Sequence, residues 1–157
     1  MHLTDLLTAD RVAVRHNGNS ATLDKPQAIH LLAELLARGT AIGPDVIERV
    51  LREREALQST GIGEGVAIPH GALLELDKQL AAVLTIPEGV DFEAIDGAKV
   101  NILFAVIGPK RASGEHLKTL ARVSRLLRSR GFRERLLAAG HGPDVFRMLL
   151  AEEEANR

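Results

Sequence analysis

The apolar stretches LAAVLTIP (residues 80–87) and VNILFAVIG (residues 100–108) decide the class of fold that this sequence predicts. Both are continuous apolar runs rather than alternating patterns, and such runs are typical of strands covered on two faces. The connector between them, EGVDFEAIDGA (residues 88–98), leaves room for another short strand. Upstream, VAVRH (residues 12–16) predicts a further strand, which the polar turn NGNSATLD (residues 17–24) follows.

Helical patterns on both sides of these runs supply layers that would cover such a sheet. Helices are expected at residues 26–38, from Pro44 to about Glu55, from about Ser113 to a break at Gly131, at 132–139 and at 143–154. Helices that flank a small buried sheet make an α/β architecture. Because the chain has no internal repeat and no linker rich in Pro, Gly or Ser, we expect one domain over residues 1–157. Its core is expected at about residues 3–150, with a frayed tail at 151–157.

The composition narrows the classes of function. The 157 residues are 45% hydrophobic and 26% charged, which is typical of a globular protein, and they include no cysteine. The absence of cysteine excludes disulfides, thiolate catalysis and cysteine-based zinc sites, and it fits a reducing cytoplasm. The sequence shows neither a signal peptide nor a run of about 18 apolar residues, so we expect a cytoplasmic protein without membrane insertion. The net charge of −1 argues against nucleic-acid binding as its main role.

The motifs present do not support the common metal and nucleotide sites. None of the six histidines has the close spacing of a metal-binding segment, so only a metal site assembled from distant residues stays open. The glycines of GIGEG (residues 61–65) lack the Lys-Ser or Lys-Thr pair of a P-loop. They also follow a helix and precede a strand, which reverses the order of a dinucleotide-binding fingerprint. No GxSxG motif of a serine hydrolase is present.

One histidine has a setting that suggests chemistry. In GIGEGVAIPHG (residues 61–71), His70 comes at the end of a short strand-like run between Pro69 and Gly71. Pro69 restricts the backbone, while Gly71 would allow a sharp turn or the close approach of a partner. A neutral imidazole has one nitrogen that can attack an electrophile, and its N–H can be held by a carbonyl or a carboxylate. The alternative is a loop histidine without any chemical role.

Two further residues could support an anion bound at His70. Arg54 lies near the end of the preceding helix, and His116 lies near the start of the helix that follows residues 100–108. A guanidinium fork, a second imidazole and helix N-terminal amides would together stabilise a phosphate. Each residue also has a purely structural alternative. Arg54 could pair with an acidic residue one turn earlier, and His116 could bond to its helical neighbours.

A third cluster of charge lies in the C-terminal third of the chain. It consists of Arg122, Arg125, Arg128, Arg130, Arg133 and Arg135. A solvated helix face would explain these arginines, and a basic docking surface is the alternative. The sequence does not decide between them.

The segment LREREALQSTGIGEGVAIPHG (residues 51–71) strongly resembles the active-site signature of the fructose/mannitol-type enzyme IIA domains of the bacterial phosphoenolpyruvate-dependent phosphotransferase system. The nitrogen-regulatory enzyme IIA proteins look most similar, because STGIGEGVAIPHG is nearly their motif. SGEHLKTLARVSRLLRS (residues 113–129) is similar to the second hallmark segment of the family. The likeness extends from about residue 3 to residue 150.

The resemblance implies a central mixed sheet with helices on both sides and a phosphotransferase that acts through a phosphohistidine. His70 would accept a phosphoryl group on Nε2 from a small HPr-like carrier, and His116 and Arg54 would stabilise the phosphate. No cofactor and no metal are implied, because the phosphoryl group arrives already activated on nitrogen. The added charge of about −1.5 to −2 would make the protein a switch that alters which partners dock.

Two alternative functions remain at this point. A sugar-specific enzyme IIA can stand alone and pass its phosphoryl group to a IIB domain, whereas a regulatory enzyme IIA acts on other protein targets. The wording of residues 59–71 favours the regulatory type. A protein-binding module that is never phosphorylated belongs to a different class, and such a module would have no need of His70 together with His116.

Overall fold

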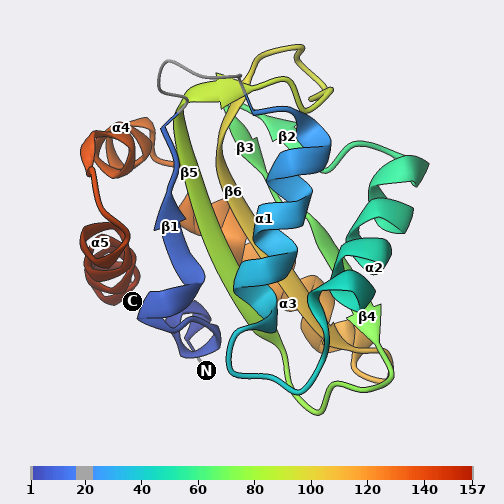
Figure 1. The fold of residues 1–157 in the computed structure, drawn as a ribbon. Helices are drawn as coiled ribbons and strands as arrows, with labels where there is room; N and C mark the ends of the chain where they lie inside the picture. The colour runs from blue at the N-terminus through green and yellow to red at the C-terminus, as the bar shows by residue number, and fades with distance from the viewer. Residues whose placement is uncertain (1, 17–22, 157) are drawn as a thin grey trace.

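A six-stranded mixed sheet lies between two layers of helices in the computed structural model of this chain, which describes residues 2–16 and 23–156 (Figure 1). The strands are β1 (Val12–Val14), β2 (Gly61–Gly63), β3 (Val66–Ala67), β4 (His70–Leu73), β5 (Leu80–Val90) and β6 (Val100–Pro109). The helices are α1 (Lys25–Ala37), α2 (Pro44–Leu57), α3 (Ser113–Leu126), α4 (Arg130–Ala138) and α5 (Gly142–Ala155), with two short 3₁₀ turns at Leu3–Leu6 and Ala9–Arg11. The predicted α/β architecture with a mixed sheet and helices on both faces is confirmed.

The centre of the sheet is the antiparallel pair of long strands, β5 and β6. β1 adds in parallel to the outer side of β5, and β3 and β4 add in parallel to the outer side of β6. β2 then pairs with β3 in an antiparallel hairpin, in which Gly63 and Gly65 adopt positive φ angles of 102° and 83°. The glycines of GIGEG therefore make a tight hairpin at the sheet edge, because glycine adopts such angles without steric cost.

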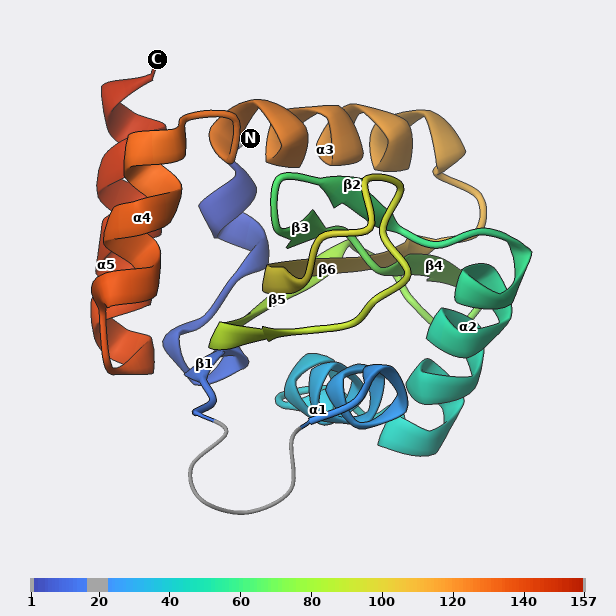
Figure 2. The same ribbon diagram turned by 90° about the horizontal axis from the view of Figure 1, so that it is seen from above.

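Each of the two central strands sends alternate residues into two separate cores. Ala82 and Leu84 of β5 pack with α1 and α2, whereas Ala81 and Val83 pack with α3, α4 and α5. Figure 2 shows the sheet between these two groups of helices. Because both faces are covered, no polar face is required, and this explains why the sequence runs of β5 and β6 are continuously apolar. None of the helices in the described part of the chain is long and apolar enough to cross a membrane.

The first half of the chain follows the predicted elements closely. α1 and α2 lie where the periodicity places them, and Pro44 begins α2 as a first-turn proline. β1 is shorter than predicted and ends at Val14, and most of the predicted polar turn (residues 17–22) lies outside the described residues. The connector between the long strands forms no strand of its own, because its first residues extend β5 to Val90.

The C-terminal half differs from the predicted boundaries in two places. The break after α3 falls at residues 127–129 rather than at Gly131, because the hydroxyl of Ser129 caps the first turn of α4. The tail expected to be frayed is helical as far as Ala155. The Glu153 carboxylate accepts hydrogen bonds from the backbone N–H groups of Leu3 and Thr4, at 2.5 and 2.9 Å. This contact ties the end of α5 to the N-terminal turn.

Candidate active site

His70 lies where the edge of the sheet is interrupted. β3 and β4 run one after the other along the same side of β6, separated only by Ile68 and Pro69. His70 therefore begins a strand, whereas the sequence indicated that it ends one. The interruption leaves the Ile68 carbonyl outside the strand ladder, where it accepts a hydrogen bond from the His70 ring.

The two nitrogens of the His70 ring have different partners. Nδ1 lies 2.7 Å from the Ile68 carbonyl oxygen, which can only accept, so Nδ1 carries the proton. The lone pair of the neutral ring is then on Nε2, and the Nε–H of Arg54 donates to it across 3.2 Å. With this assignment Nε2 is the ring nitrogen that could act as a nucleophile, and it lies against a cation that could stabilise an arriving anion.

α2 positions Arg54 through two stripes of residues that repeat every fourth position. Ile47, Leu51 and Glu55 are buried, while Val46 and Val50 pack beside them and bring Arg54 to β4. Arg54 also donates from Nη1 to the backbone carbonyl of Gln58 at 2.8 Å, at the end of its own helix. Since residue 50 is a valine, no acidic residue stands one turn before Arg54, and the structural alternative for this arginine fails.

Gly71 has a different role from the one that the sequence suggested. It lies within β4, opposite Ile107 of β6, rather than at a turn that clears an approach for a partner. A β-carbon on this residue would overlap Cγ1 of Val50 on α2. The glycine therefore sets how closely α2, and with it Arg54, approaches the edge strand.

We expect Gly71→Ala to destabilise the protein by about 1–2 kcal/mol and to weaken the contact between Arg54 and His70, because the added methyl group pushes α2 outward. Chemical denaturation measures the first effect, and the ¹⁵N shift of His70 Nε2 measures the second. Val50→Ala in the same chain removes the overlapping methyl group and should restore both. If the double variant is no better than Gly71→Ala, the Val50 contact is not what requires a glycine here.

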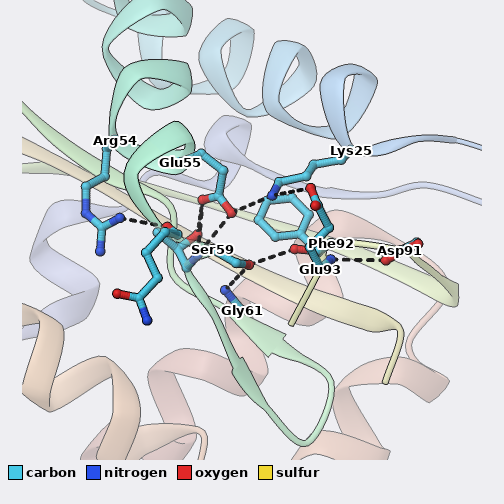
Figure 3. A network of polar contacts seen from close by, with 10 residues as sticks. Lys25, Arg54, Glu55, Ser59, Gly61, Asp91, Phe92 and Glu93 are labelled. Carbon is cyan, nitrogen blue, oxygen red and sulfur yellow. Dashed lines mark hydrogen bonds and ion pairs between the residues drawn. The ribbon is translucent and has the colours of Figure 1, made fainter. Parts of the chain in front are cut away.

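A buried carboxylate fixes the segment that follows Arg54 (Figure 3). The Glu55 side chain accepts hydrogen bonds from the backbone N–H and the hydroxyl of Thr60, and it pairs with Lys25 at 2.9 Å. Lys25 in turn lies over the ring of Phe92, 4.8 Å from its centroid. The network joins the start of α1, the end of α2 and the entry to β2, so the Arg54 backbone is held from three sides.

His116 completes the site from the opposite helix layer. It lies in the first turn of α3, and its ring centroid is 5.5 Å from that of His70. Its Nδ1 is buried against Gly108 of β6, where a β-carbon would come within 3.5 Å of that nitrogen. The three predicted residues, Arg54, His70 and His116, are thus brought together around one edge of the sheet.

The pKa values of both histidines are lowered from the ordinary value of 6.5. Burial is the main cause in each case, because it disfavours the charged imidazolium. The positive charge of Arg54 lowers the pKa of His70 further, although its bond to the Ile68 carbonyl acts in the other direction. The neighbouring His70 adds to the lowering of the pKa of His116. Both rings are therefore neutral at neutral pH, the form in which a nitrogen can act as a nucleophile.

These shifts predict how stability depends on pH. As the pH falls through 6.5, the unfolded chain binds protons at both histidines before the folded protein does, so the free energy of unfolding decreases until the lowered pKa values are passed. Urea denaturation at a series of pH values measures this slope, and replacing His70 with Gln should reduce it. A histidine titration by NMR that places the pKa of His70 at or above 6.5 would contradict the prediction.

The arginine-rich stretch does not form one surface. Arg133 is buried and donates from Nη1 to the carbonyls of Leu127 and Arg128, both at 2.8 Å, so it caps the end of α3. Its Nη2 pairs with Glu64 of the β2–β3 turn at 3.1 Å. Arg130 and Arg135 are exposed and pair with acidic residues on α4 and α5. Arg122, Arg125 and Arg128 line a groove beside the N-terminal turn.

Three contributors to the site were not found from the sequence. The Ile68 carbonyl and Val50 leave no chemical signature, because one is a main-chain group and the other an ordinary apolar residue. Glu55 does leave a signal, since it stands where the buried stripe of Ile47 and Leu51 would place another apolar residue. The described residues contain no group of three or more His, Asp or Glu side chains placed to hold a metal ion.

Comparison with known proteins identifies the family and agrees with this fold. Residues 6–152 match the family described as "Phosphoenolpyruvate-dependent sugar phosphotransferase system, EIIA 2". A nitrogen regulatory protein of Bradyrhizobium diazoefficiens is 35% identical over 149 residues, covering 95% of each chain. The crystal structure of the nitrogen regulatory protein IIA-Ntr of Neisseria meningitidis superposes with a TM-score of 0.83 at 28% identity, over 94% of this chain and 98% of that one.

A sugar-system protein is also similar. The fructose-specific EIIABC component of Bacillus subtilis is 30% identical over 140 residues, which cover 88% of this chain and 21% of that protein. The fold and these likenesses define the class as enzyme IIA of the phosphotransferase system. The chain belongs to the EIIA 2 family of that system.

Proposed function

We propose that this protein is a phosphoryl carrier that accepts a phosphoryl group on Nε2 of His70 from a phosphohistidine of an HPr-like protein. The observation that carries the proposal is the pair of contacts made by the His70 ring. The Ile68 carbonyl holds the proton on Nδ1, and Arg54 lies at the lone pair of Nε2. A histidine without a chemical role would not need a neutral nitrogen directed at a guanidinium.

The transfer is an in-line displacement between two imidazole rings. As Nε2 of His70 bonds to phosphorus, the bond between phosphorus and the donor nitrogen breaks and its electron pair returns to the donor ring. No proton has to leave His70 for this step, because Nε2 has none and the other proton stays on Nδ1, which donates it in a hydrogen bond to the Ile68 carbonyl. The chain supplies position and charge stabilisation.

Arg54 and His116 would hold the phosphoryl oxygens. The Nε–H of Arg54 already lies 3.2 Å from the acceptor nitrogen, so it is placed to donate to an oxygen of a group bonded there. The His116 ring lies 5.5 Å from the His70 ring, on the side that belongs to α3. Two donors from opposite helix layers would fix the phosphoryl group from two directions.

Exposed apolar side chains beside these residues suit a protein partner. Leu57, in the last turn of α2, is 82% exposed, and Leu117, directly after His116, is 67% exposed. Large apolar groups in such positions are more favourable when another protein covers them. We therefore place the docking surface of the carrier protein around His70, between these two leucines.

We further propose that the protein has a regulatory role. Two nitrogen regulatory relatives match 95% and 94% of this chain, and their names support a regulatory role. We infer a cytoplasmic switch whose phosphorylation state target proteins would read. The alternative is a sugar-specific enzyme IIA that passes the group to a IIB domain, which the likeness to the fructose-specific component supports. A target protein that binds one phosphorylation state better than the other favours the first role, and rapid transfer to a IIB domain favours the second.

Incubation with phosphoenolpyruvate, enzyme I and an HPr-like protein tests the phosphocarrier function. We expect intact-mass measurement to show the addition of one phosphoryl group, and ¹⁵N NMR to place it on Nε2 of His70. Omission of the HPr-like protein is the control, and it should leave the mass unchanged. A chain that stays unmodified in the complete mixture, or one modified on another residue, would exclude the proposal and would favour the binding-module alternative.

The role of Arg54 can be tested while its positive charge is kept. We expect Arg54→Lys to slow phosphoryl transfer by about tenfold or more, because lysine lacks the planar fork that can contact His70 and Gln58 together. Single-turnover transfer from the phosphorylated carrier measures the rate, and Arg52→Lys on the exposed side of the same helix is the matched control. Equal rates for wild type and Arg54→Lys would show that only charge matters at this position.

A further inference from the structure

Two buried polar atoms near the site have no hydrogen-bond partner. Among the described residues, Oε1 of Gln79 and Nδ1 of His116 are both shielded from solvent and unpaired. Gln79 is only 5% exposed and directly precedes β5. Both side chains lie over Gly108 of β6. A β-carbon there would come within 3.1 Å of Gln79 Cγ and within 3.5 Å of His116 Nδ1.

Such neighbouring unpaired atoms require a common explanation. Buried polar groups are almost always hydrogen-bonded, since an unpaired one loses its bonds to water without replacement. The amide of glutamine presents a donor on one side and an acceptor on the other, and a half-turn of its last torsion exchanges them. The amide carbon is bonded to Cγ, so a half-turn about the Cγ–Cδ bond places the NH₂ group where Oε1 lies, and this side chain and the imidazole lie over the same glycine.

We propose that the side-chain amide of Gln79 donates a hydrogen bond to Nδ1 of His116 and thereby keeps the His116 proton on Nε2. Nε2 lies across the ring from the buried Nδ1, so the N–H is directed away from Gly108 and is available to a group at His70. Gln79 is thus a positioning residue that acts through His116. The effect of this hydrogen bond on a phosphoryl group rests on the proposed function, whereas the tautomer of His116 does not depend on that function.

The opposite arrangement of the ring would disable this contact. With the proton on Nδ1, His116 would present a lone pair from Nε2, which would repel phosphoryl oxygens instead of binding them. Gly108 contributes to the arrangement because any side chain there would separate Gln79 from His116. Gly108, which leaves room for both side chains, and the buried amide of Gln79 therefore act together in fixing the His116 tautomer.

The tautomer of His116 can be measured by ¹⁵N NMR on the unphosphorylated full chain, at a pH above 6.5. We expect wild type to show a protonated Nε2 and an unprotonated, hydrogen-bonded Nδ1. Gln79→Glu replaces the donor with an acceptor, so the proton should move to Nδ1 or both nitrogens should become protonated. Gln79→Met, of similar volume, should remove the hydrogen-bond shift at Nδ1. Lys78→Met, at the exposed neighbouring position, should change neither nitrogen.

The outcomes separate this inference from the proposed function. A His116 proton on Nδ1 in wild type, or a tautomer that is the same in Gln79→Glu, would overturn the role of Gln79 whether or not His70 is phosphorylated. If phosphorylation occurs, loss of the amide should shorten the lifetime of phospho-His70 by about fivefold, as expected for one hydrogen bond. His70 resonances are the internal reference, because the Ile68 carbonyl should hold its tautomer in every variant.

Discussion

Replacing His70 with alanine is expected to abolish phosphoryl uptake and to leave the fold intact. The ring is half-buried at the sheet edge and outside both apolar cores, so its loss removes little packing. Intact-mass measurement after incubation with the complete donor system checks the first expectation, and circular dichroism checks the second. The loss should exceed about 10³-fold, because no other nitrogen in the site combines a free lone pair with a guanidinium neighbour.

His116→Ala is the matched comparison, since it removes the same kind of ring from the same site. We expect this variant to be phosphorylated, with slower transfer or a shorter-lived product, because in the proposed function His116 would stabilise the phosphoryl group without bonding to it. Phosphorylation that persists in His70→Ala would reject His70 as the acceptor. If His116→Ala is not phosphorylated at all while His70→Ala is phosphorylated normally, then His116 is the acceptor and His70 the stabilising residue.

Replacing Glu55 with alanine is expected to lower the free energy of unfolding by about 3 kcal/mol. The carboxylate is 7% exposed, and its loss would leave the Thr60 N–H buried without a partner and would separate Lys25 from its buried counter-ion. Urea denaturation measures the effect. Glu53→Ala, at an exposed position on the same helix, should change stability by no more than about 0.5 kcal/mol.

The same substitution should also loosen Arg54. Glu55 holds the end of α2 to β2 and α1, so its loss frees the turn from which Arg54 reaches His70. We expect the ¹⁵N shift of His70 Nε2 to move toward that of an unbonded nitrogen in Glu55→Ala and to stay unchanged in Glu53→Ala. A large loss of stability with an unchanged Nε2 shift would mean that Glu55 supports the fold without positioning Arg54.

Much of the fold could be predicted because its main signals are local. Continuous apolar runs identified β5 and β6 as doubly covered strands, and Pro44 marked the start of α2. The two boundary errors have different causes. Ser129 caps α4 through a local bond to the Phe132 N–H, and the prediction took Gly131 as a helix break instead of Ser129 as a cap. Glu153 secures the last turns of α5 through its bonds to the N-terminal turn, a contact that neighbouring residues alone cannot reveal.

The side chains of the candidate site were proposed from the sequence, whereas the contacts that support them were not. His70, Arg54 and His116 stood out because their chemistry and their family resemblance could be recognised in the sequence. The supporting contacts belong to the folded arrangement, in which Gly71 packs against Val50 and the side chains of Gln79 and His116 both lie over Gly108. Gly71 shows the difference most clearly. Its small size was recognised, but the reason for it is a helix packed against the strand.

The interruption of the edge strand at Ile68 and Pro69 also affects how the site can change through evolution. The group that selects the tautomer of His70 is a main-chain carbonyl, so no exchange of a side chain can delete it. By contrast, a single amino-acid replacement can remove the side chain of Arg54, His116 or Glu55. We therefore expect the identity of the reactive nitrogen to be robust to mutation, while the residues that surround the transferred group can be adjusted one at a time to suit different partner proteins.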